Sequence, residues 1–150
     1  MSTLKEQLHQ QCVNYVQQRM DAAQQAIAEA QQAANNDTKS SAGDKYETGR
    51  EMAQQETNRN LTQLNEANKL MVALNRIGTV AQSITAEAGS IIKTNQGNFY
   101  LSISAGNIRV NNEAYVAIST ASPVGLKLKG ARIGDQFDFN GKRYLITEVL

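Results

Sequence analysis

Two acidic residues, Asp44 and Glu47, stand three positions apart directly after Gly43, in a stretch whose residue types favour the start of a helix. Residues three apart on a helix share a face. Carboxylates are the ligands that hard cations such as Mg²⁺ bind, although two of them complete a site only together with ligands from elsewhere. Acids in the first turn of a helix also interact favourably with the helix dipole. The pair therefore fits either a shared metal site or an ordinary helix start.

Basic residues flank this acidic pair and fit contacts with phosphate groups. Arg50, Lys45 and Lys39 are candidates for contact with a nucleic-acid phosphate near the acids. For each lysine, a solvated surface charge is an equally good interpretation. Asp37 and Glu51 are expected to be surface acids.

The remaining reactive side chains suggest no catalytic site of their own. His9 stands at a polar helix position with no Cys or His nearby, and it is expected on the solvated surface. Cys12 falls in an apolar stripe, where a cysteine behaves as a small core residue. No positioned base accompanies Ser119 or Ser122, so nucleophilic catalysis is not indicated.

Composition limits the class of protein. The chain has 150 residues, 41% hydrophobic and 19% charged, with a formal net charge of +1. This is typical of a folded protein and gives no overall basic field for nucleic-acid binding. A single cysteine cannot form an internal disulfide, and no signal sequence or apolar run of about 18 residues is present. We therefore expect a cytoplasmic protein with no membrane partner.

Two long stretches without Gly or Pro open the chain, over residues 1–42 and 50–77. Both are rich in helix formers, and their apolar residues recur every three to five positions. Turn-forming residues separate the stretches at 35–43. The sequence thus predicts helices near 3–35 and 44–77 that pack as an antiparallel hairpin, and a dimerising coiled coil is the alternative. The stripe residues are Leu4, Leu8, Cys12, Tyr15, Met20, Ala23, Ile27, Ala30 and Ala34, then Ala53, Leu61, Leu64, Ala67, Met71 and Leu74.

The second half changes to short strand-like runs between glycines. About five strands are expected, near 90–94, 98–104, 114–118, 135–139 and 143–149, and Asn140-Gly141 marks a hairpin turn. Ser122 and Pro123 open a short helix that Gly130 closes. The fold class is α+β, with a helical hairpin domain over 1–78, its acidic tip near 43–47, and a small antiparallel β domain with one helix over 79–150.

Two segments carry a resemblance to a known family. Gly43-Asp44-Lys45-Tyr46-Glu47 resembles the tip of the Gre transcript-cleavage factors, and Ser122-Pro123 through Gly134-Asp135 is similar to the signature of their FKBP-like C-terminal domain. Both segments stand in the family's order, in a chain of fitting length. The chain departs from the family at Thr48-Gly49-Arg50-Glu51, after the tip.

The resemblance implies a transcription elongation factor whose hairpin enters the secondary channel of RNA polymerase. The two tip acids, Asp44 and Glu47, are then the catalytic and metal-binding residues: they help to hold a second Mg²⁺, shared with the polymerase active site, for cleavage of the backtracked nascent RNA 3′ end. The factor is no enzyme by itself and is expected to be a monomer. Rival hypotheses are a secondary-channel regulator without cleavage activity, a coiled-coil adaptor and, least favoured, a prolyl isomerase.

Overall fold

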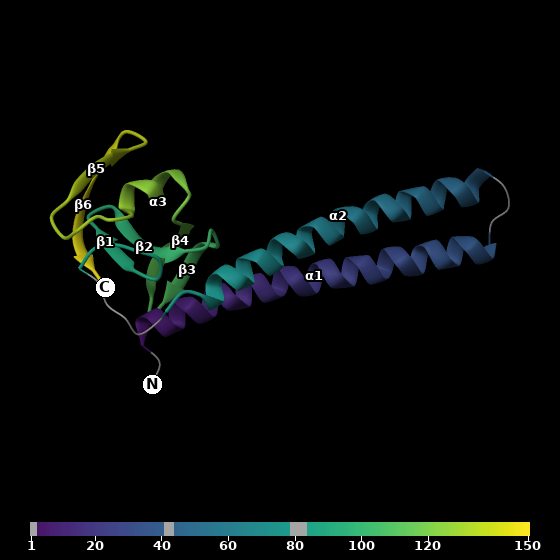
Figure 1. The fold of residues 1–150 in the computed structure, drawn as a ribbon, viewed down its shortest axis with the longest axis horizontal. Helices are drawn as coiled ribbons and strands as arrows, with labels where there is room; N and C mark the ends of the chain where they lie inside the picture. Colours follow the sequence, from purple (N-terminus) through teal and green to yellow (C-terminus); the bar gives the residue numbers. More distant parts are fainter. Residues whose placement is uncertain (1–2, 41–43, 79–83) are drawn as a thin grey trace. The chain divides into compact units, whose positions relative to one another are not determined.

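A computed structural model describes residues 3–40, 44–78 and 84–150, with side chains described outside 34–50. Two long helices precede a mostly antiparallel sheet with one short helix, so the expected α+β fold is confirmed (Figure 1). In chain order the elements are α1 (Leu4–Ser40), α2 (Asp44–Asn75), β1 (Ile91–Thr94), β2 (Gly97–Ser102), β3 (Gly106–Val110), β4 (Glu113–Ser119), α3 (Pro123–Leu128), β5 (Gln136–Phe139) and β6 (Lys142–Val149).

The chain forms two compact units. One, which we call the arm, is Val16–Met71, and the other, the sheet unit, combines Met1–Tyr15 with Val72–Leu150. The first turns of α1 therefore fold with the sheet, although they are continuous with the arm helix.

In the arm, α1 and α2 lie side by side (Figure 1) and pack along a seam with alternating steps of three and four residues, as in a coiled coil. On α1 the seam residues are Val16, Met20, Ala23, Ile27 and Ala30, and on α2 they are Thr57, Asn60, Leu64 and Ala67. Leu61, expected in the stripe, is instead 43% exposed. The spacing of three and four residues places Asn60 and Thr57, not Leu61, in line with Leu64 and Ala67. Two polar residues therefore occupy this part of the seam.

The sheet has six strands in the order β3-β4-β2-β1-β6-β5. All neighbouring pairs are antiparallel except β2 and β4, which are parallel. About five strands in an antiparallel sheet were expected, whereas the sheet has six strands and one parallel pair. After β2 the chain first forms the outer strand β3. The next strand, β4, is antiparallel to β3 and lies between β3 and β2, where it runs parallel to β2.

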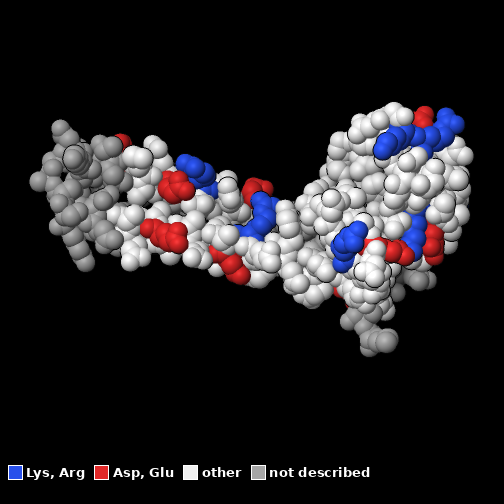
Figure 2. All heavy atoms as spheres, turned by 180° about the vertical axis from the view of Figure 1, so that it is seen from behind, with Lys and Arg blue, Asp and Glu red and all other residues white. Residues whose placement is uncertain are grey.

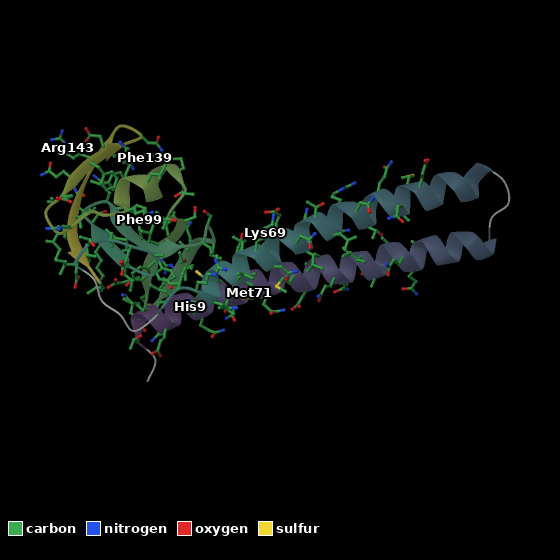
Figure 3. All side chains as sticks on the ribbon, viewed as in Figure 1. His9, Lys69, Met71, Phe99, Phe139 and Arg143 are labelled. Carbon is green, nitrogen blue, oxygen red and sulfur yellow. The ribbon has the colours of Figure 1, made fainter. Side chains whose placement is uncertain are left out.

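One face of the sheet packs against α3. Phe99 and Leu101 of β2 point to this face, and Figure 3 labels Phe99 there. Ser122 caps α3 as expected, because its Oγ accepts a hydrogen bond from the Gly125 N–H at 3.0 Å. The buried cluster on this face comprises Ala86, Ile92, Phe99, Leu101, Ile118, Leu128, Ala131 and Ile146.

The opposite face of β2 is covered as well. Tyr100 and Ser102 alternate with Phe99 and Leu101 along the strand and are buried too. The Cys12 Sγ lies 3.6 Å from the Ser102 Oγ, which places the first turns of α1 on this face. The sheet is therefore buried on both sides at β2.

Candidate functional site

The acidic pair predicted from the sequence stands at the beginning of α2. Asp44 is the first residue of this helix, and Glu47 lies three residues further in the same first turn. Lys45 and Arg50 follow in α2, while Lys39 lies at the end of α1. The backbone thus brings all five candidate residues to the helix ends at the tip of the hairpin. Their side chains lie outside the described part of the chain, so their predicted contacts stay predictions.

The donor types at the tip suit a hard cation. Two carboxylates one helical turn apart offer oxygen ligands, and Mg²⁺ completes its coordination with water and with groups of a partner. Among the residues with described side chains, no cluster of three or more His, Cys, Asp or Glu gathers that could hold a metal ion. The predicted site is of the shared kind, in which a second molecule supplies further ligands.

Charges along the described arm are mixed in sign. Five acids and three bases lie on residues 16–33 and 51–71, namely Asp21, Glu29, Glu51, Glu56 and Glu66 with Arg19, Arg59 and Lys69. Arg59 pairs with Glu56 and Lys69 with Glu66, each at 3.3 Å. Figure 2 shows red and blue side chains interspersed on this unit, and Figure 3 labels Lys69, which projects outward. This surface has no continuous basic track for RNA.

The helices of the described segments are polar along most of their length. None of them has the length and apolar character that crossing a lipid bilayer would require.

The sheet unit has a groove beside α3 and β5. Lys127, Lys129 and Asp135 are among the residues that line this groove of about 300 Å³. The large apolar side chains of Leu126 and Ile133 are 66% and 62% exposed near it in the chain. Exposed apolar side chains of this size occur in protein-binding surfaces, so both residues are candidates for contact with a partner.

Two residues outside the tip differ in how well the sequence predicted them. His9, expected on the solvated surface, is half-buried, and its Nδ1 has no hydrogen-bond partner among the described residues. Burial lowers the pKa of this imidazole. Cys12 is buried as predicted, and burial raises the pKa of its thiol. A thiol of this kind is unreactive because its thiolate is disfavoured.

The aromatic residues of β5 and β6 contribute to packing. Phe137 packs against the buried cluster and stacks on Tyr144, with ring centroids 4.9 Å apart. The ring centroids of Tyr144 and Phe99 lie 6.0 Å apart. Ser122 is occupied as the cap of α3 and donates its hydroxyl hydrogen to the Ser119 carbonyl at 2.7 Å. These contacts give the aromatic residues and serines structural roles.

Sequence reasoning missed the strand β3 and the turn that follows it. The signal was present: Asn111 and Asn112 have φ of 54° and 66°, and two consecutive asparagines suit the turn type that joins tight hairpins.

A scan against models of known protein families and a search of curated proteins both return no match to this chain.

Proposed function

We propose that this protein is a transcription elongation factor that enters the secondary channel of RNA polymerase and stimulates cleavage of backtracked nascent RNA. The observation that carries the proposal is the position of Asp44 and Glu47 in the first turn of α2, at the tip of an antiparallel helical hairpin. The resemblance to the Gre factors assigns a role to acids at this place. A hairpin of two helices of more than 30 residues is long enough to carry them into a narrow channel.

The chemistry of phosphodiester hydrolysis explains why a pair of acids suffices. In the two-metal route, one ion activates the attacking water and the other stabilises the leaving oxygen. The polymerase provides the RNA and one metal site, while Asp44 and Glu47 supply carboxylate oxygens for the second Mg²⁺. Their first-turn position also lets the helix dipole offset part of the repulsion between two negative charges.

We assign binding to RNA polymerase to the sheet unit. Most apolar side chains of the arm lie in the seam between its two helices, although Met52 and Leu61 are 65% and 43% exposed. In the sheet unit, Leu126 and Ile133 are exposed, and so are Lys127 and Lys129, which line the groove beside α3 and β5. We therefore infer that the sheet unit provides most of the affinity for polymerase and that the arm positions the acids.

The test is an RNA cleavage assay with the cognate polymerase stalled in a backtracked state on labelled RNA. Asp44→Asn and Glu47→Gln each remove one charge while keeping size and hydrogen-bonding capacity. Each is expected to abolish most of the cleavage, to leave polymerase binding unchanged and to change the free energy of unfolding by less than about 1 kcal/mol. Raising the Mg²⁺ concentration should partly restore cleavage by mass action.

Glu51→Gln is the matched control, since it removes the same charge one turn after Glu47 at a side chain that is exposed. It should cleave as wild type does. If both tip variants also cleave as fast as wild type, the two acids are only helix-start residues and the site assignment is wrong.

A secondary-channel regulator without cleavage activity is the second candidate. The mixed charges of the described arm, with more acids than bases, favour it, because little on this surface attracts RNA. Binding to polymerase without stimulated cleavage at any Mg²⁺ concentration would identify this alternative. Absence of polymerase binding would instead favour the adaptor hypothesis.

A further inference from the structure

The strand β3 forms an edge of the sheet. It pairs with β4 on one side, and no described strand pairs with its other side. An edge of this kind presents backbone N–H and C=O groups that can pair with an extended chain from another molecule.

The register fixes which backbone groups point outward. The Asn111-Asn112 turn joins β3 to β4 with Val110 opposite Glu113, and the pair that flanks a two-residue turn is a hydrogen-bonded one. Hydrogen-bonded and non-hydrogen-bonded pairs alternate along an antiparallel ladder, so the backbone of Ile108 also bonds to β4. Arg109 and Asn107 instead direct their backbone N–H and C=O groups to the side of β3 that faces away from β4. The Ala114 carbonyl, opposite Arg109, accordingly turns toward β2, where it accepts from the Asn98 side chain at 3.5 Å.

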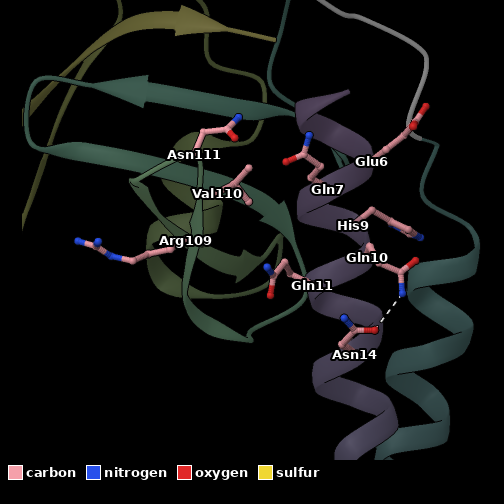
Figure 4. Close-up of a pocket in the computed structure, with 9 residues that line it drawn as sticks. All are labelled: Glu6, Gln7, His9, Gln10, Gln11, Asn14, Arg109, Val110 and Asn111. Carbon is pink, nitrogen blue, oxygen red and sulfur yellow. Dashed lines mark hydrogen bonds between the residues drawn. The ribbon is translucent and has the colours of Figure 1, made fainter. Parts of the chain in front are cut away.

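A groove of about 650 Å³ lies beside this edge, on the face of the sheet that the first turns of α1 cover. Figure 4 shows Gln7 and Gln11 reaching from α1 toward β3, while Val110 and Asn111 point toward α1. Side-chain amides both donate and accept hydrogen bonds. The groove therefore has room for one face of an added strand, and the Gln11 amide can bind polar side chains on that face.

The other face of an added strand would meet Arg109. The side chain of Arg109 points away from α1 (Figure 4), is exposed and makes no ion pair with any described residue. Opposite charges on facing positions of paired strands attract each other. We propose that the β3 edge binds an extended acidic segment of a partner protein as an added strand, with its main chain on Asn107 and Arg109 and its carboxylates facing the Arg109 guanidinium. This proposal does not depend on the polymerase proposal.

The probe for this site is a short blocked peptide in which Thr alternates with Glu, so that one face of the strand is acidic. A second peptide carries Lys in place of Glu. The Glu peptide should slow amide hydrogen exchange of the full-length protein at Asn107 and Arg109, and should leave Ile108 unchanged because its amide is already bonded to β4. Arg109→Glu should weaken binding of the Glu peptide roughly tenfold and strengthen binding of the Lys peptide.

Lys142→Glu is the matched control, with the same charge change at an exposed residue of β6. It should not alter binding of either peptide. Equal binding of the two peptides, absence of binding by the Glu peptide, or protection that does not alternate along β3 would overturn the proposal. A protein dimer that the Glu peptide dissociates would show that a second copy of this chain, and not an acidic segment, is the occupant of the edge.

Discussion

Tyr100 illustrates how a single buried polar atom bears on stability. The side chain is fully buried, and its hydroxyl has no hydrogen-bond partner among the described residues. Burial, with the Cys12 thiol nearby, raises the pKa of this phenol. Since an unpaired buried polar group is unfavourable, Tyr100→Phe should increase the free energy of unfolding, by up to about 1 kcal/mol, as measured by urea denaturation.

Tyr115 provides the control, since its hydroxyl donates to the Glu113 carboxylate at 3.0 Å. Burial and this bond raise its pKa to about 12. Tyr115→Phe should lower the free energy of unfolding by about 0.5–1.5 kcal/mol. A loss of stability in both variants would show that the Tyr100 hydroxyl does have a partner.

His9 gives the sheet unit a dependence on pH. Burial lowers the pKa of the folded imidazole, so the unfolded state binds the proton more tightly. The stabilisation by neutral His9 is complete above the unfolded pKa of about 6.5 and is lost as the pH falls through the folded pKa. Urea midpoints at about pH 7.5 and 5.5 should therefore differ less for His9→Gln than for wild type. An identical difference in both proteins would contradict this assignment.

At the scale of elements, local sequence signals predicted most of the secondary structure, whereas pairing required the three-dimensional fold. The two helices and the cap at Ser122 follow from short-range patterns, and the structure confirms them. The first helix, however, continues to Ser40, through residues that the sequence assigned to the turn. The strand β3 was missed because Gly106 and Asn107 resemble a loop, and burial of Ile108 and Val110 depends on packing against distant residues. Asp44 and Glu47 were singled out because their segment resembles the Gre tip. The backbone places both residues at the start of α2, and the metal site itself stays a prediction.

The seam of the arm yields a prediction of its own. Asn60 is buried there, and its side-chain amide donates to the Glu56 carbonyl of the same helix at 2.9 Å. A polar residue at a seam position specifies register at the expense of stability. Asn60→Leu should therefore raise the free energy of unfolding of the arm by about 1 kcal/mol through added apolar burial. The exposed Asn65→Leu is the control, and a seam variant no more stable than this control would contradict the assigned register.

At the scale of the whole molecule, α1 belongs to both compact units, which makes the sheet unit dependent on the N-terminal residues. Leu8 and Cys12 are fully buried, and Cys12 contacts Ser102 on the face of β2 opposite α3. Residues 81–150 expressed alone would leave Tyr100 and Ser102 exposed to water on that face. We expect this fragment to be less stable than the full chain, so polymerase binding by the sheet unit is best measured in the intact protein.

A single substitution tests the same dependence without truncation. Leu8→Ala removes a fully buried side chain, which typically lowers the free energy of unfolding by about 2–5 kcal/mol. If the first turns of α1 stabilise the sheet, amide exchange at Tyr100 and Ser102 should accelerate, although both residues are more than 90 positions away in the sequence. Ile27→Ala in the arm seam is the control, and it should accelerate exchange in the arm but not in β2. Unchanged amide exchange at Tyr100 in Leu8→Ala would mean that the sheet folds independently of the hairpin. Polymerase binding, proposed for the sheet unit, and placement of the acids, proposed for the arm, would then reside in separable parts of the chain.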